Sequence, residues 1–155
     1  MQKLIVRIQG DPKGQPRPRA YARRMGNNFV ARVYDSDVAD AWKKAVRDAV
    51  QREALRLYPT RLEDVPFRVA MAFYFARPRS HFSTAGILKA KFAIWHLQKP
   101  DCDNLAKLVL DQITDLGTIW KDDSQVVTLL VQKFWLRDQR EHGSCDLTIE
   151  PMIGW

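Results

Sequence analysis

Cysteine is scarce in this chain, and long hydrophobic runs are absent. The 155 residues include only Cys102 and Cys145, which form neither a C-x-x-C pair nor a zinc-binding pattern. We therefore expect two reduced thiols and no disulfide framework, which favours a cytoplasmic protein. No apolar run approaches the roughly 18 residues of a membrane span, and the charges in residues 1–7 argue against a signal peptide. We expect no membrane partner.

Acidic residues are also scarce, but only in two stretches. Residues 1–34 contain eight lysines and arginines and a single acid, Asp11, so they carry the whole net charge of +7. Residues 65–100 contain no acid and six basic residues. Acid-poor basic segments are typical of phosphate-binding surfaces. The predicted nucleic-acid contacts in these stretches are Lys13, Arg17, Arg19, Arg23, Arg24 and Lys99.

Apolar residues alternate along several segments, as they do in half-buried strands. The alternation predicts strands at about 3–9, 67–75, 125–136 and 144–150. The turn signal Gly26-Asn27-Asn28 predicts a hairpin between residues 20–25 and 29–34. A hydrophobic content of 46% and a length of 155 residues suit one domain spanning residues 1–155.

Two other segments have apolar residues at helical spacing. The first predicted helix begins near residue 36 and is stopped by Pro59. Its apolar stripe consists of Val38, Trp42, Ala45, Val46 and Ala49. The second runs from about 103 to 116, with Gly117 as its C-cap. Elements in this order predict an α+β fold, a mixed β-sheet with two main helices packed on one face.

The long segment 77–99 predicts a basic loop with some local structure, and long ordered loops are often functional. His81 and His96 lie within it, and His142 lies far along the chain. Because the three histidines have no metal-ligand spacing, we interpret each as a surface or loop residue and not as a ligand.

The most distinctive feature that is present is a cluster of aspartates in this basic chain. Between residues 101 and 123 all six acids are aspartates, namely Asp101, Asp103, Asp111, Asp115, Asp122 and Asp123. Neighbouring carboxylates repel unless a cation neutralises them, and hard divalent ions prefer oxygen ligands. The cluster therefore predicts a divalent-metal site beside a polyanion.

Asp101 and Asp103 flank Cys102 where an extended segment meets the second helix. Residues two apart in an extended segment point the same way, so both carboxylates could converge on one ion. Helix capping is the alternative, but one aspartate is enough for a cap. The adjacent carboxylates of Asp122 and Asp123, just before a strand, should repel each other in the same way. Two carboxylates at one junction and one at the other suit Mg²⁺, which takes few protein ligands.

Lys107 and Asp111 follow Asp103 at i+4 and i+8 and share its helix face, whereas Asp115 is expected on ordinary helix surface. A solvated face with ion pairs is the alternative for Lys107 and Asp111. Lys107 could instead hold a phosphate oxygen or offset charge in a transition state. Together with a metal that activates water, these residue types indicate hydrolysis of a phosphodiester.

Three motifs together resemble the RusA family of Holliday junction resolvases, small metal-dependent endonucleases common in phages and prophages. The first is Lys99-Pro100-Asp101-Cys102-Asp103-Asn104-Leu105 with Lys107 and Asp111, and the second is Asp122-Asp123-Ser124-Gln125-Val126. The third is the loop with Gly10 and Gln15-Pro16-Arg17-Pro18-Arg19 after the first strand.

The resemblance implies a homodimeric α+β enzyme that acts in DNA recombination and repair. It implies binding of four-way DNA junctions and paired nicks made with Mg²⁺, for which Mn²⁺ could substitute. Asp101, Asp103 and Asp123 would be the metal-binding catalytic acids, and Lys107 the catalytic or DNA-contacting lysine. Asp111 and Asp122 stay open between a direct and a supporting role. A dimer with two-fold symmetry would place two sites symmetrically on a two-fold-like junction.

Two other functions stay open at this point. A non-catalytic DNA-binding protein with structural aspartates would be indifferent to EDTA. A metal-dependent hydrolase of small nucleotides would cleave free nucleoside triphosphates, but it would make little use of the basic N-terminal segment. The segregated charge and the resemblance favour the junction-cleaving endonuclease over both.

Overall fold

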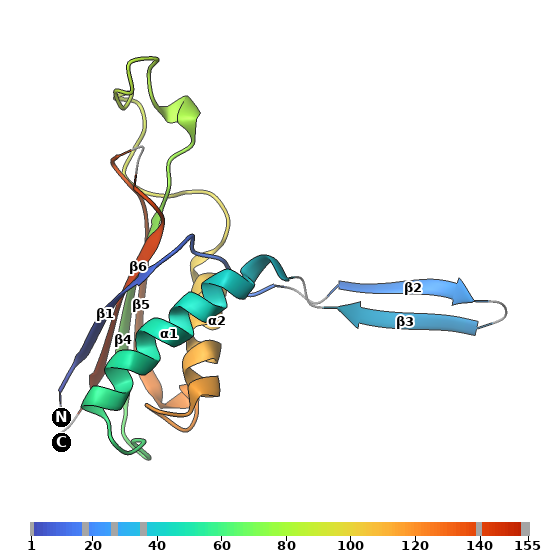
Figure 1. Cartoon of the computed structure of the whole chain (residues 1–155), viewed down its shortest axis with the longest axis vertical. Coiled ribbons are helices and arrows are strands. Elements are labelled where there is room, and N and C mark those ends of the chain that lie inside the picture. The colour runs from blue at the N-terminus through green and yellow to red at the C-terminus, as the bar shows by residue number, and fades with distance from the viewer. Residues whose placement is uncertain (1, 17–18, 26–27, 35–36, 139–140, 153–155) are drawn as a thin grey trace.

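The computed structural model describes residues 2–16, 19–25, 28–34, 37–138 and 141–152. Figure 1 shows a sheet with two helices on one face and a hairpin that projects away from this body. The predicted α+β fold, with a mixed sheet and two main helices on one face, is confirmed. Among the described residues, no helix is both long and apolar enough to cross a membrane.

Four strands form the main sheet. Their order across the sheet is β1 (Leu4–Gln9), β6 (Ser144–Pro151), β4 (Phe67–Phe75) and β5 (Val126–Trp135). β6 pairs antiparallel with β1 and β4, whereas β4 and β5 are parallel. Parallel neighbours need a crossover connection, and here α2 (Cys102–Leu116) lies in that connection. The crossover therefore places the aspartate-rich helix beside the sheet, with one end at each end of β5.

The helices bury one face of the sheet. α1 (Asp40–Leu57) buries residues spaced by four, namely Trp42, Val46, Val50 and Ala54. The opposing residues of β4 alternate, and the buried ones are Phe67, Val69, Met71 and Phe73. Each fully buried valine, methionine or phenylalanine among them stabilises the fold by about 1.5–3 kcal/mol. The left-handed φ of 61° at Gly117 confirms the predicted C-cap of α2.

Val38 is the one predicted stripe residue that the structure places outside the core. It lies in a short 3₁₀ turn, η1 (Asp37–Ala39), and is 67% exposed. The turn precedes α1, so the 3.6-residue spacing used in the prediction does not apply to Val38. Residues 35 and 36, where the helix was expected to begin, lie outside the described residues.

The predicted hairpin is confirmed as β2 (Arg19–Met25) and β3 (Asn28–Tyr34). The two strands pair with each other and with no strand of the main sheet. In Figure 1 they extend sideways beyond the N-terminal end of α1. The most basic part of the sequence therefore forms an arm attached to the body at one end.

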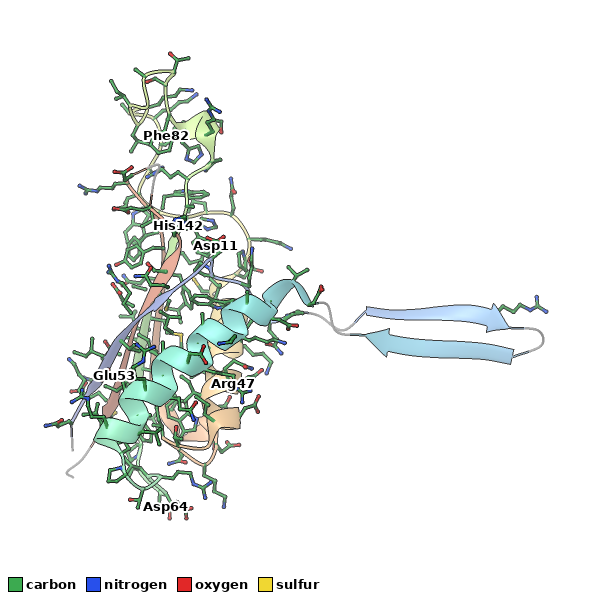
Figure 2. All side chains as sticks on the ribbon, in the orientation of Figure 1. Asp11, Arg47, Glu53, Asp64, Phe82 and His142 are labelled. Atoms are coloured by element: carbon green, nitrogen blue, oxygen red, sulfur yellow. The ribbon has the colours of Figure 1, made fainter. Side chains whose placement is uncertain are left out.

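The loop at 77–99 is largely ordered by buried polar and aromatic groups. It contains η2 (Arg79–His81), and Phe82 marks its position at the far end of the body from Asp64 in Figure 2. The Arg77 guanidinium donates to the carbonyls of Leu136 and Ala93, at 2.6 and 2.9 Å. These bonds fasten both ends of the loop to the end of β5.

His81 and His96 are buried and not on the surface. His81 stacks on Phe92, and His96 stacks on Phe75 and leans on Trp135. Their burial was not expected because loop histidines are usually solvated. The aromatic residues around them supply a small core of their own, which hydrophobic periodicity does not reveal.

Candidate active site

Side chains from both helices and from the turn before β5 line one groove of about 480 Å³. The lining residues are Gln15, Lys43, Lys107, Asp111, Gln112, Thr114, Asp115, Asp122 and Asp123. Four carboxylates and two ammonium groups therefore share one concave surface. Of the predicted site residues, the groove brings together Lys107, Asp111, Asp122 and Asp123.

Asp101 and Asp103 lie at the other end of α2. Asp101 is extended and precedes the helix, Cys102 begins it, and Asp103 is in the first turn. The argument from an extended segment is therefore wrong for this pair, because Asp103 is already helical. Asp101 makes no side-chain capping hydrogen bond, so helix capping does not explain its presence either. Both residues are exposed to solvent.

A stripe of polar residues runs down α2 from Asp103 to the groove. Lys107, Asp111 and Asp115 follow at intervals of four residues. The Lys107 ammonium lies 3.5 Å from the Asp111 carboxylate, and the lysine side chain is 63% exposed. Such a pair contributes only about 0.2–0.5 kcal/mol, so Lys107 stays available to an incoming phosphate. Asp115, expected on ordinary helix surface, is exposed but also lines the groove.

Asp122 and Asp123 differ in their surroundings. The Asp122 carboxylate accepts a hydrogen bond of 2.9 Å from the Ser124 amide and so caps the turn η3 (Asp123–Gln125). Its hydrogen bonds with Ser124 hold the pKa of Asp122 below the ordinary value. Asp123 is half-buried and lines the same groove. This geometry gives Asp122 a structural task and leaves Asp123 as the better candidate ligand.

Gln125 explains why the Asp122-Asp123 turn has a fixed shape. Its side-chain oxygen accepts from the Lys121 amide at 2.9 Å, and its side-chain nitrogen donates to Leu62 and Val65, each at 3.1 Å. These bonds close the turn on itself and fasten it to the segment before β4. The glutamine of the second motif therefore fixes the position of the turn that carries the two carboxylates.

The N-terminal loop of the third motif packs against the first turn of α2. The Gln15 amide donates to the Asn104 carbonyl at 3.1 Å. A Cβ at Gly14 would lie 2.4 Å from the Asn104 side-chain nitrogen, so a larger residue there would displace the Asn104 side chain. This contact carries the Gln15 side chain into the groove, where its oxygen is enclosed and has no protein hydrogen-bond partner.

Lys133 and Lys43 are site-related residues that the sequence did not reveal. The Lys133 ammonium donates to the carbonyls of Gln98 and Pro100, both at 2.8 Å, and so holds the segment directly before Asp101. Lys43 reaches the groove from α1. Neither residue belongs to a motif, and only the packing of distant segments brings them to these places.

The donor chemistry suits a hard divalent ion, but the six aspartates do not converge. Among the described residues, no three acidic, histidine or cysteine side chains are close enough to hold a metal. Asp103 and Asp115 are about 18 Å apart along the helix axis, at 1.5 Å per residue. Mg²⁺ needs only one or two carboxylates besides water and phosphate, and either end of α2 supplies two.

The predicted DNA-binding residues lie mostly away from the groove. Lys13, Arg24 and Lys99 are exposed. Arg19 and Arg23 belong to β2, whose backbone alone is described at these positions, and Arg17 lies outside the described residues. Residues 19–34 of the arm contain four arginines and no acid, whereas the carboxylates all lie outside it.

The fold places carboxylates and lysines in one groove of a basic chain, and comparison with known proteins shows the family. Residues 9–141 match the family described as "Endodeoxyribonuclease RusA", so the chain belongs to the RusA endodeoxyribonuclease family. It is also similar to the "Uncharacterized protein YqaN" of Bacillus subtilis (strain 168), with 32% identity over 136 residues. That alignment covers 86% of this chain and 88% of the relative.

Proposed function

We propose that this protein is a Mg²⁺-dependent, structure-specific endonuclease that resolves Holliday junctions by paired phosphodiester cleavage in DNA recombination and repair. The observation that carries the proposal is the groove, in which four aspartates meet Lys107 and Lys43 in a chain of net charge +7. Membership of the RusA family supports the nuclease chemistry. A DNA substrate and two free cysteines suit a cytoplasmic location.

Each group in the proposed site has a separate task. Asp101, Asp103 and Asp123 would hold Mg²⁺ or Mn²⁺. When bound, the metal would activate water and stabilise the charge on the phosphoryl group. Lys107 would contact a phosphate oxygen and offset its developing charge. Asp111 would orient Lys107, to which it is already paired, and Asp122 would hold the turn.

The length of α2 makes a homodimer part of the proposal. Among the described residues, Asp101, Asp103 and Asp123 of one chain do not form a group of three ligands, so the third carboxylate would come from a second copy. Two-fold symmetry would also present two equivalent sites to a junction whose opposed strands must both be cut. The projecting arms would add phosphate contacts on either side.

One gel tests the proposal. A synthetic four-way junction, a linear duplex and a single strand of matched sequence are each incubated with the protein in Mg²⁺ or in EDTA. We expect the junction alone to be cut, into two nicked duplexes, and only in Mg²⁺. Binding of the junction without cleavage would instead support the non-catalytic alternative. Hydrolysis of nucleoside triphosphates without cleavage of DNA would support the small-nucleotide alternative.

A further inference from the structure

An exposed apolar segment lies just before the first aspartates of the cluster. Ile94, Trp95 and Leu97 are 41%, 50% and 87% exposed, and the residue between the last two, His96, is buried. Single exposed apolar residues are common on protein surfaces, but a contiguous exposed group marks a surface that contacts a ligand or a partner. None of these residues lines the groove. The segment is therefore a second contact surface on the body.

Backbone hydrogen bonds fasten this segment to the end of β5. The His96 amide donates to the Lys133 carbonyl at 3.2 Å, and the Trp135 amide donates to the Ile94 carbonyl at 2.7 Å. Trp95 lies between the two bonded residues of the segment, so its backbone is held on both sides. An exposed side chain on a fixed backbone loses little conformational freedom when it binds a ligand.

The Trp95 ring rests on other aromatic rings and still meets solvent. Because His96 is buried, the alternation of an extended segment turns Trp95 and Leu97 outward. The centroid of the Trp95 ring lies 4.9 Å from that of Phe134, which stacks on Tyr74 at 5.4 Å. Trp95 nevertheless remains 50% exposed. An indole supported in this way presents a flat apolar surface on which a further ring can stack.

The charges around the segment suit a polyanion. Residues 65–100 contain no acid. Lys89, Lys91 and Lys99 of this stretch are exposed. Proteins that bind single-stranded nucleic acid combine positive charge, which contacts the phosphates, with aromatic side chains, which stack on the bases. The two features together favour a nucleic-acid strand as the occupant of this surface.

The segment is also tied to the proposed metal ligands. The Lys133 ammonium donates to the carbonyls of Gln98 and Pro100, each at 2.8 Å, and Asp101 follows directly. Six residues of chain span at most about 22 Å, so Trp95 lies within that distance of Asp101. About six nucleotides of a stacked strand cover the same distance, at about 3.4 Å each. One DNA strand could therefore contact both places.

We propose that Trp95 stacks on an unstacked nucleobase at the branch of a DNA junction, with Leu97 wedged beside the same base. The inference rests on the proposed function, because it assigns the surface that recognises the branch. A base inside a linear duplex is stacked on both faces, whereas a base at a branch or in a single strand can offer a free face. Apolar side chains such as leucine insert at opened base steps. Trp95 would therefore favour branched and single-stranded DNA over linear duplex.

Binding in EDTA tests the proposal without any cleavage. Trp95→Leu keeps an apolar side chain but removes the ring, and it should weaken binding to a four-way junction and to a single strand by roughly 5- to 100-fold. Binding to a linear duplex of matched sequence should be unchanged. Trp95→Phe keeps a ring and should retain most of the affinity. Circular dichroism establishes that both variants are folded.

Ile5→Ala is the matched control for an exposed apolar residue. Ile5 is 65% exposed on β1, at the opposite edge of the sheet from β5. This variant should bind all three DNAs as the unaltered chain does.

A crosslink locates the contact on the DNA. 5-Iodouracil is placed either at the branch point or deep in one arm of the junction, and the complex is irradiated and digested. The peptide that contains Trp95 should carry the label from the branch point and not from the arm. Label on this peptide from the arm alone would overturn the proposal.

Two results separate this proposal from the nuclease function. Normal binding of the junction and the single strand by Trp95→Leu, or an equal loss for linear duplex, would overturn the stacking proposal even if the unaltered chain cuts junctions. An equal loss in Trp95→Phe and Trp95→Leu would do the same, because stacking needs only a ring. If the unaltered chain bound junctions through Trp95 but cut none in Mg²⁺, the nuclease function would be contradicted and the stacking surface would stand.

Discussion

The acidic groove and the basic hairpin differ in how firmly they are held. The groove lies on the packed body, where Trp120 donates to Thr114 at 2.9 Å and Gln125 fastens the turn before β5. The hairpin consists of two strands that pair only with each other. An isolated two-stranded hairpin is marginally stable in water. Under the proposed function, the packed body would hold the site for chemistry and the hairpin would supply a separate arm for binding DNA.

The largest expected effect comes from a change on the packed body, at the first turn of α2. Asp103→Asn should lower junction cleavage by on the order of 100- to 1,000-fold or more, because it removes a charge that the reaction needs. Junction affinity should persist or increase, because one carboxylate that repels phosphate is gone. Single-turnover cleavage and gel-shift binding measure the two effects.

Asp48→Asn is the matched control, since it removes an exposed acid that pairs with Lys44 on α1 and does not line the groove. The control should cleave normally. If Asp103→Asn cleaved as well as the control does, Asp103 would have no role in the chemistry.

Lys107→Ala should have the next largest effect. We expect turnover to fall more than affinity, because one phosphate contact is a small part of a many-contact interface. Lys44→Ala is a close control, since Lys44 pairs with Asp48 on α1 just as Lys107 pairs with Asp111 on α2. Equal losses of rate in both variants would show that the charge matters only for binding.

Neutralising the hairpin should change binding but not chemistry. Replacing Arg19 and Arg23 by alanine should weaken junction binding several-fold. The slope of log affinity against log salt concentration should become shallower by about two, because each lost phosphate contact reduces it by about 0.9. The cleavage rate at saturating protein should be unchanged. A control that replaces Arg56 and Arg61, which are exposed and paired with Glu53 and Glu63, removes the same charge from the body. An unaltered salt dependence in the hairpin variant would show that Arg19 and Arg23 do not contact DNA phosphates.

The smallest expected effect is on the stability of the 77–99 loop. Burial, together with Arg77 near His81 and Lys133 near His96, lowers the pKa of each histidine. The folded state therefore keeps both rings neutral to a lower pH than the unfolded chain does, and unfolded histidine has a pKa of about 6.5. Stability is fully present above that pH and falls as the pH drops below it, because the unfolded chain binds more protons.

Urea unfolding between pH 7.5 and 5 measures this dependence. Replacing exposed His142 by glutamine should leave the slope of unfolding free energy against pH unchanged. His96→Phe should reduce that slope. A slope that His96→Phe does not alter would mean that this histidine is not held neutral by the fold. The hairpin, which lies far from this loop in Figure 1, should not contribute.

Periodicity was enough to predict the elements, but not how they meet. The alternation of β4, the hairpin turn and the Gly117 cap are local features, and each was predicted from its own residues. The groove depends on contacts between distant segments, as when Lys43 of α1 joins Asp115 of α2. No local spacing encodes such contacts.

The aspartates show the same limit of prediction from sequence. Their clustering in the sequence predicted one site, yet Asp103 and Asp115 lie about 18 Å apart along α2. Sequence proximity therefore overstated their closeness in space. Lys133 is the reverse case, since it lies 33 residues from Pro100 in the chain and is bonded to its carbonyl.

The separation of chemistry from binding is tested most directly by one paired measurement on a four-way junction. Affinity and single-turnover cleavage rate are determined for Asp103→Asn and for the Arg19 and Arg23 double variant under the same conditions. We predict that the first variant loses rate and keeps affinity, and that the second loses affinity and keeps rate. If rate and affinity fell together in both variants, the account of a rigid catalytic body and a separate binding arm would be contradicted.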